Sequence, residues 1–278
     1  MSNLLILANN FETEKKRFEQ YFDEVTAKSL ADVLIDTETG EKSQVTVDGE
    51  RMEEWNSVYI KPEPKAFNYT RVLMESLNSR EINCNLDSST VFIFTKKPYL
   101  FKVLADKSIK IPKQVAISTE KGMTEIEKDI DFPVLAKKYS NLELVETQIY
   151  SEFDELKNFA ELTEHGEDFL IIQEYEESEV FDLLYIDGKI ISLKLEEQPW
   201  TSSEGENVSR SYYTVSDTKK EVVKNAAEAI GTKICRIRMN GDKIVDMDTE
   251  PELEMFKQKS GKNVYGRVAD VLKQGEES

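Results

Sequence analysis

The chain has 278 residues, with 36 lysines and arginines against 54 aspartates and glutamates, which gives a net charge of −18. This balance argues against nucleic acid as a partner, because contacts to phosphate backbones need clustered basic side chains. No apolar run approaches the roughly 18 residues of a membrane span, and the N-terminus lacks the positive region of a signal peptide, so we expect neither a membrane partner nor secretion.

The first ninety residues alternate between strand and helix patterns. This alternation predicts an open, mostly parallel α/β sheet. The expected strands are 4–8, 33–36, 57–60 and 82–86, and the expected helices are 12–22 and 69–77, with a small hairpin at 44–49. A longer helix over 97–106 leads into Ile111-Pro112.

The pattern then changes to α+β. Strands are expected at 132–138, 142–150 and 169–175, a helix at 152–162, and a hairpin at 181–195 around Asp187-Gly188. Thr218 and Glu221 have the spacing of a capping box before a helix over 221–230, with Gly231 as its C-cap. A last helix is expected at 264–272.

A second hairpin pattern lies between these two helices. Two alternating runs, 235–239 and 243–248, flank Asn240-Gly241, which is the strongest short-range hairpin signal. Because residues two apart share a face of a strand, Asp246 and Asp248 should point the same way. Paired carboxylates hold Mg²⁺ well, although a solvated acidic face is the alternative in so acidic a chain.

The order of these elements and four local strings resemble the ATP-grasp fold, specifically its RimK-like carboxylate–amine ligases. The strings are the helix at 97–106, FPVLAKK at 132–138, LIIQEYEE at 170–177 and IVDMDTEPEL at 244–253. The resemblance implies an N-terminal Rossmann-like domain over 1–90, a central lobe over 91–168 and a C-terminal lobe over 169–278, the two α+β lobes enclosing a nucleotide cleft.

The resemblance also implies roles for single residues, with ATP and Mg²⁺ as cofactors. Lys97 and Lys137 would contact the nucleotide, and Asp246 and Asp248 would hold the metal. The hinge strand that hydrogen-bonds adenine would end in Gln173, Glu174 and Tyr175. We therefore expect one cleft to be lined by Lys97, Lys137, Glu174 and Asp246.

Two departures from the family pattern concern the phosphates and the metal. The family has a glycine-rich loop where this chain has 139–146, which contains no glycine and two glutamates. Arg238 stands where the family has a metal-binding Asp, with Arg236 on the same face. We expect Arg238, with Arg236, to form ion pairs with Asp246 or Asp248, because guanidinium and carboxylate groups pair well. The alternative is that an arginine contacts a phosphate or an anionic substrate, which would make both arginines candidate catalytic residues.

Two functions are consistent with these patterns. The first is an ATP-dependent ligase that phosphorylates the carboxylate of a small molecule or peptide and lets an amine attack the acyl phosphate. The second is a nucleotide-binding or scaffold protein that kept the fold and lost the chemistry. The two cysteines, Cys84 and Cys235, lie in apolar strand patterns and are expected to be free thiols, typical of the cytoplasm. Homo-oligomerisation is left open.

Overall fold

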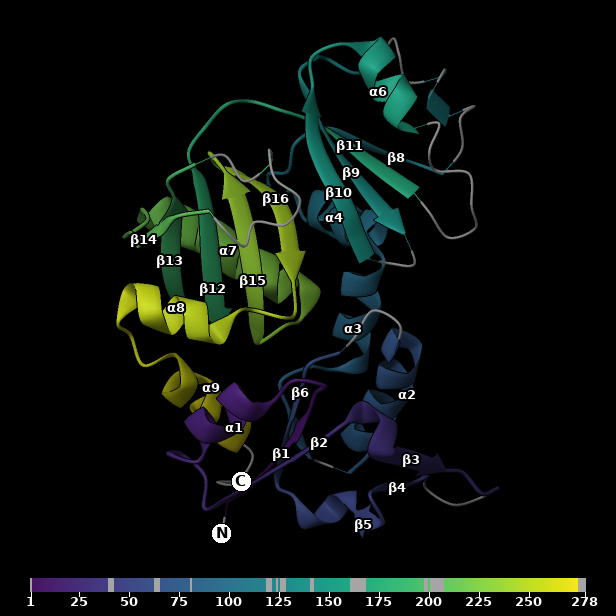
Figure 1. Ribbon diagram of the computed structural model, residues 1–278, viewed down its shortest axis with the longest axis vertical. Coiled ribbons are helices and arrows are strands. Elements are labelled where there is room, and N and C mark those ends of the chain that lie inside the picture. The colour runs from purple at the N-terminus through teal and green to yellow at the C-terminus, as the bar shows by residue number, and fades with distance from the viewer. Residues whose placement is uncertain are drawn as a thin grey trace.

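Figure 1 shows the computed structural model, which is built on β-sheets in three parts of the chain. The structure describes residues 2–39, 43–62, 66–80, 82–118, 122–123, 125, 129–140, 143–160, 169–197, 200 and 208–274. The N-terminal part lies at the bottom of the view, a small sheet at the upper right and a larger sheet at the upper left. Within the described residues, no helix is long and apolar enough to cross a membrane.

The N-terminal part is built on a parallel sheet with the order β2-β1-β6-β7. Its strands are β1 (Asn3–Leu7), β2 (Glu24–Lys28), β6 (Ser57–Ile60) and β7 (Asn83–Cys84). Leu4, Leu5, Ile6 and Leu7 are fully buried, because both faces of the sheet are covered. The predicted parallel sheet is confirmed, but the strand expected at 33–36 is not part of it, because β2 occupies the place beside β1 and 33–36 pairs in an antiparallel sheet.

Helices and a three-stranded antiparallel sheet complete this part. The helices are α1 (Glu12–Phe18) and α2 (Phe67–Asn78), with short 3-10 helices at Leu30–Asp32 and Met52–Glu54. The three-stranded sheet has the order β3-β4-β5 and consists of β3 (Val33–Asp36), β4 (Gln44–Val47) and β5 (Glu50–Arg51).

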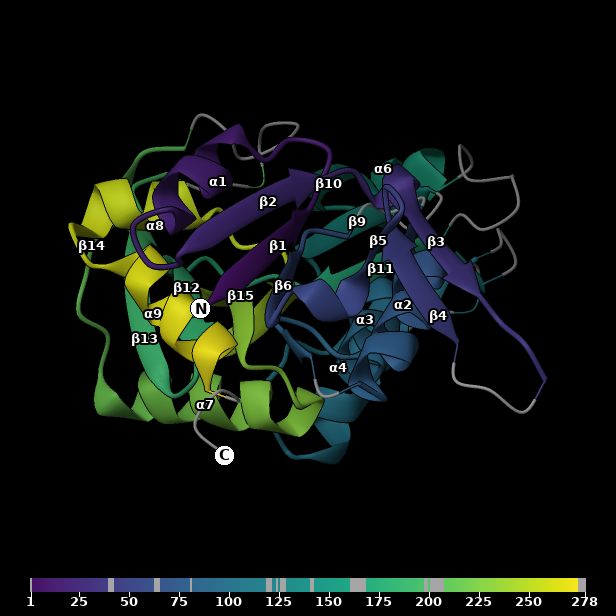
Figure 2. The same cartoon turned by 90° about the horizontal axis from the view of Figure 1, so that it is seen from below.

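The C-terminal helices return to the N-terminal sheet. They are α8 (Leu253–Ser260) and α9 (Val264–Lys273), and α9 contacts α1, beside which it lies in Figure 1. The Tyr265 ring meets the Phe18 ring edge-on at 5.3 Å, and the Ser57 hydroxyl donates to the Leu272 carbonyl at 2.9 Å. In Figure 2 the purple and yellow ends of the chain lie together. The last helix therefore contributes to the core of the first sheet.

The small sheet is antiparallel and has the order β10-β9-β11-β8. Helices α3 (Ser88–Thr95) and α4 (Lys97–Asp106) lead to it, and its strands are β8 (Gln114–Ile117), β9 (Val134–Ser140), β10 (Glu143–Tyr150) and β11 (Phe169–Glu174). Helix α6 (Phe153–Ala160) packs on one face of the sheet. The other face carries Leu135, Lys137 and Ile171, and the large sheet packs against it.

The pairing of strand β11 disagrees with the predicted boundary between the central and C-terminal lobes. A boundary at residue 169 would divide the small sheet, because β11 pairs with both β8 and β9. The change from one sheet to the next falls between Glu174 and Val180. We keep the three-part division as a proposal with this later boundary.

The larger sheet is antiparallel and has the order β14-β13-β12-β15-β16. Its strands are β12 (Val180–Ile186), β13 (Lys189–Leu195), β14 (Arg210–Tyr212), β15 (Ile234–Asn240) and β16 (Lys243–Asp248). Helix α7 (Asp217–Ile230) covers the face formed by Phe181, Leu183 and Ile237. The hairpin predicted from Asn240-Gly241 is confirmed, with Gly241 at φ +59.

The ends of α7 show one correct and one wrong prediction. Gly231 ends the helix in the left-handed conformation at φ +78, as expected. The predicted capping box of Thr218 and Glu221 is wrong, because the helix begins at Asp217 and the Ser216 side chain accepts from the Lys219 N–H. The helix begins earlier than predicted because Ser216, which precedes Thr218 in the chain, is also a favoured N-cap residue.

Candidate active site

A row of charged side chains crosses the face of the large sheet that is turned away from α7. Asp182 on β12 lies directly opposite Arg238 on β15, and Arg238 lies opposite Asp246 on β16. Two residues before Arg238 on β15, Arg236 lies opposite Asp248. Because directly paired residues in an antiparallel sheet share a face, the register alone gathers these five side chains.

Asp182 is the buried centre of one half of this row. Its carboxylate has no exposed surface and accepts two hydrogen bonds from Arg238, at 2.7 and 3.0 Å, and one from Arg210 on β14 at 3.1 Å. Burial acts to raise the pKa of Asp182, but the three arginines outweigh it and the pKa falls to about 2.

The expectation that Arg238 pairs with Asp246 or Asp248 is therefore wrong. A buried carboxylate needs a cation as its partner. Asp182 lies next to Arg238 on β12, a strand whose pairing with β15 was not predicted from the sequence. Arg236 makes the expected contact in its place. It forms an ion pair with Asp248 and lies 3.9 Å from Asp246.

Lys97, at the start of α4, closes the other end of the row. Its ammonium group donates to Asp246 at 2.9 Å and to the Met247 carbonyl. Burial acts to raise the pKa of Asp246, but Lys97, Lys137 and Arg236 hold it well below its usual range. Lys97 and Asp246 are thus brought together as predicted from the sequence.

Lys137 reaches the same place from the small sheet. The side chain is only 2% exposed and donates to the Val245 carbonyl. Its ammonium group lies 5.9 Å from the centres of the Phe101 and Trp200 rings. Burial, helped by the neighbouring cations, lowers the pKa of Lys137 to about 8 against the attraction of Asp246. None of the carboxylates in the described part of the chain forms an ion pair with it.

The three hinge residues lie at the edge of this cluster. Gln173 is fully buried and donates to the Gln114 side chain at 2.7 Å, while Glu174 pairs with Lys113 at 3.3 Å. The Glu174 N–H donates to the Lys113 carbonyl and the Tyr175 N–H to the Pro133 carbonyl, both at 2.9 Å. These two N–H groups are used in strand pairing, and the role of Gln173, Glu174 and Tyr175 in binding adenine stays a prediction.

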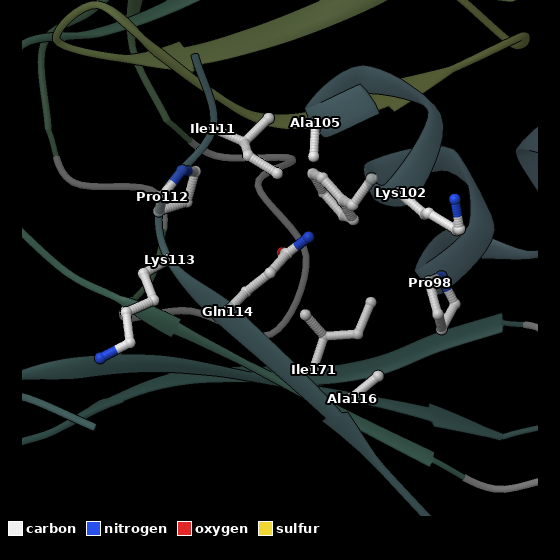
Figure 3. Close-up of a pocket in the computed structure, with 10 residues that line it drawn as sticks. Pro98, Lys102, Ala105, Ile111, Pro112, Lys113, Gln114, Ala116 and Ile171 are labelled. Carbon is white, nitrogen blue, oxygen red and sulfur yellow. The ribbon is translucent and has the colours of Figure 1, made fainter. Parts of the chain in front are cut away.

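A pocket of about 490 Å³ lies between α4 and strands β8 and β11. Its walls are mostly apolar, and Figure 3 shows Gln114 and Ile171 projecting from the sheet toward α4. The pocket adjoins the charged row, because Phe101 lines it and also lies beside Lys137. Lys102 and Lys113 stand at its rim. The size and mixed lining are those of a small-molecule site.

Sequence reasoning did not select Asp182 or Arg210. Asp182 did carry a signal, because it is the one acidic residue in the otherwise apolar run Val-Phe-Asp-Leu-Leu-Tyr-Ile of β12. A charge in the centre of such a strand needs a buried partner. Arg210 lies in a polar stretch, Ser209-Arg210-Ser211, with no pattern that marks it.

The charged row does not fit a magnesium ion. Asp246 and Asp248 are already bound to Lys97 and Arg236, and Arg238 occupies the predicted third ligand position. No cluster of three metal-ligating side chains is found among the described residues. A divalent cation 4 Å from one guanidinium would be repelled by roughly 8 kcal/mol at an effective dielectric of 20.

Comparisons with known proteins place this arrangement in a fold. No family model and no curated protein matches the chain. Among solved structures, the ATP-grasp ligase PsnB, complexed with minimal precursor, Mg and ADP, has a TM-score of 0.75 at 12% identity, covering 98% of this chain and 96% of PsnB. A RimK domain protein ATP-grasp from Sphaerobacter thermophilus has a TM-score of 0.71 at 14% identity, covering 97% and 99%.

A third similar structure is D-alanine–D-alanine ligase from Bacillus anthracis complexed with ATP. Its TM-score is 0.65 at 13% identity, covering 99% of this chain and 97% of the ligase. These similarities show that the chain has the ATP-grasp fold, and the fold predicted from the sequence is confirmed.

Proposed function

We propose that this protein binds an adenine nucleotide between its two ATP-grasp sheets, with the phosphates at Lys137, Lys97 and Arg236. The single observation that carries the proposal is Lys137. A lysine that is buried, still mostly protonated at pH 7 and without a carboxylate partner among the described residues is a position prepared for an anion.

The pocket beside Lys137 favours a nucleotide, rather than a simple anion, as the ligand. Apolar side chains such as Ile111 and Ile171 offer a surface for a planar base, and Gln114 and Lys113 offer polar groups at its edge. The pocket meets the cationic row at Phe101. A base and a phosphate chain therefore have adjacent places of the right chemistry.

A second candidate function is ligation of a carboxylate to an amine, with a peptide as one partner. The observation that favours it is the match along nearly the whole chain to ligases, of which PsnB is complexed with a precursor and ADP. In that reaction ATP would phosphorylate the carboxylate and an amine would then displace the phosphate. Under this proposal the protein would be a RimK-like ligase that acts in the cytoplasm. The paired Asp246 and Asp248 weigh against it.

Calorimetric titration with ATP, in the presence and absence of Mg²⁺, tests the first proposal. Lys137→Ala should weaken nucleotide binding by about tenfold or more, because a charge-assisted contact contributes about 1.5–3 kcal/mol. Lys224→Ala is the matched control, since Lys224 is an exposed lysine on α7 that pairs with Glu228. Absence of binding at millimolar ATP under both conditions would overturn the proposal, as would equal affinity in the two variants.

A further inference from the structure

We infer that Gln114 selects the base of the bound nucleotide, by donating an amide N–H to the N1 atom of adenine. Gln173 is the positioning residue, because it holds the Gln114 amide with its nitrogen toward the pocket. This inference rests on the proposed nucleotide function and adds to it the base specificity of the same pocket. Three features support it: the orientation of the Gln114 amide, its unused donor, and its distance from the phosphate site.

A chain of hydrogen bonds fixes the orientation of the Gln114 amide. The Val245 carbonyl can only accept, and it accepts from the Lys137 ammonium and, at 3.5 Å, from the Gln173 amide nitrogen. The same Gln173 nitrogen donates to the Gln114 Oε1 at 2.7 Å. If Gln173 turned its oxygen to this side, that oxygen would face the carbonyl of Val245. The nitrogen of Gln114 is therefore the atom left for the pocket.

This nitrogen has no other use in the described part of the chain. Gln173 is fully buried, whereas Gln114 is half-buried and lines the pocket of about 490 Å³. Figure 3 shows the Gln114 side chain extending from β8 toward α4 with its amide nitrogen at the tip. Within the described residues the Gln114 nitrogen donates no hydrogen bond. An amide N–H₂ group at the wall of a mostly apolar pocket is a donor prepared for an acceptor on the ligand.

The strand register sets how far this donor lies from the phosphate site. Ala116 on β8 and Lys137 on β9 both lie opposite Ile171 on β11. Gln114 lies opposite Gln173, two residues further along the same face. Two residues correspond to about 7 Å along a strand, and β8 lies about 10 Å across the sheet from β9. In adenine, N1 lies on the edge remote from the ribose, so a base whose phosphates contact Lys137 directs N1 toward Gln114.

An N–H donor at this place distinguishes adenine from 6-oxopurines. In adenine N1 is an acceptor without a hydrogen, whereas in hypoxanthine and guanine N1 carries a hydrogen. Two N–H groups would then face each other, and the Gln114 donor would stay unpaired inside the occupied pocket. A site that pairs one hydrogen bond strongly rejects a ligand that cannot form it. The pocket should therefore prefer ATP to inosine triphosphate (ITP).

The first test compares ligands on the wild-type protein. Calorimetry measures the affinity for ATP, for ITP and for 1-deaza-ATP, in which a C–H group replaces N1 and the 6-amino group is kept. We expect ATP to bind about tenfold more tightly than either analogue, a difference of roughly 1.4 kcal/mol. Equal affinity for ATP and 1-deaza-ATP overturns the inference and leaves the nucleotide function standing. No binding of any of the three overturns both.

Gln114→Glu replaces the donor by an acceptor and keeps the bond that holds the side chain. The carboxylate still accepts from the Gln173 nitrogen, so the ratio of ATP affinity to ITP affinity should fall by about tenfold or more. This ratio cancels the repulsion between the added charge and the phosphates. Gln148→Glu is the matched control, since Gln148 is exposed on β10 of the same sheet, and its ratio should equal that of wild type. A wild-type ratio in Gln114→Glu would contradict the assignment.

Gln173→Met tests the positioning role. Methionine fills a similar volume, but it cannot donate to Gln114 or to the Val245 carbonyl. The Gln114 amide is then free to turn, so the preference for ATP over 1-deaza-ATP should fall by about threefold or more. A merely structural role would lower both affinities together and leave their ratio unchanged. An unchanged ratio, with folding verified by circular dichroism, overturns the role given to Gln173.

Discussion

Replacing Asp182 by asparagine removes one charge from the centre of the large sheet and keeps the shape of the side chain. In the native protein this carboxylate accepts hydrogen bonds from Arg238 and Arg210 and has no exposed surface. Its pKa is lowered from 3.8 to about 2, which corresponds to roughly 2–3 kcal/mol of stability, since each pKa unit is worth about 1.4 kcal/mol. We expect Asp182→Asn to lose about this amount at pH 7.

Complete removal of the side chain should cost more. Asp182→Ala removes this carboxylate from the Arg238 and Arg210 guanidiniums in a buried place, and breaking a buried ion pair costs about 3–5 kcal/mol. Because the pKa of Asp182 is lower in the folded than in the unfolded state, its contribution is present above about pH 4 and is lost as the pH falls toward 2. The difference between wild type and Asp182→Asn should therefore shrink at acid pH.

The assay is urea unfolding followed by the fluorescence of Trp200, in a Trp55→Phe background, since the chain has only these two tryptophans. Trp200 lies beside Arg238 and reports on the cleft, whereas Trp55 belongs to the N-terminal core. Glu75→Gln is the control, because its ion pair with Arg71 is exposed and worth less than about 1 kcal/mol. An Asp182→Asn variant within about 0.5 kcal/mol of wild type would refute the assigned role of this carboxylate.

Three further predictions concern the cleft lysine, a helix cap and the thiols. Nucleotide affinity should fall by up to about tenfold for each pH unit above 8, because Lys137 must be protonated to hold an anion, and Lys137→Arg should remove this dependence in calorimetry across pH. Ser216→Ala should cost about 1 kcal/mol in urea unfolding and Thr218→Ala much less, since Ser216 provides the N-cap of α7. Burial raises the pKa of Cys84 to about 12 and that of Cys235 well above 9, so neither thiol should react with iodoacetamide at pH 8 until urea unfolds the chain.

Local signals allowed much of the fold to be predicted from the sequence. Turn dipeptides such as Asn240-Gly241 and Asp187-Gly188 marked two hairpins, because only a few residues adopt positive φ at low cost. The apolar run at 4–8 marked a buried parallel strand. Lys97 was also placed correctly, at the start of α4, where the following Pro98 suits the first turn of a helix.

Elements with weak or misleading local patterns were missed. Strand β2 is short and carries Glu24 and Lys28 at its ends, so its pattern resembles a loop. Helix α3 reads Ser-Ser-Thr-Val-Phe-Ile-Phe-Thr, which is rich in β-branched and aromatic residues and favours a strand. Its N-cap, Asp87, was the available signal, since its side chain accepts from the Thr90 N–H at 2.7 Å.

The partners in the charged row could not be read from local patterns at all. Asp182 and Arg238 are 56 residues apart in the chain and meet only through the pairing of β12 with β15. Sequence reasoning therefore gave Arg238 the acids on the neighbouring strand of its own hairpin, Asp246 and Asp248. The types of residue in the cleft were recognised, but which acid pairs with which cation is set by strand register and burial.

The most direct test of the proposed nucleotide site is a crystal structure of the protein grown with a non-hydrolysable ATP analogue. We predict phosphate oxygens within hydrogen-bond distance of the Lys137 ammonium and the Arg236 Nε, with the ion pair between Arg238 and Asp182 unbroken. A nucleotide bound away from Lys137, or an empty cleft at a saturating concentration of the analogue, would contradict it.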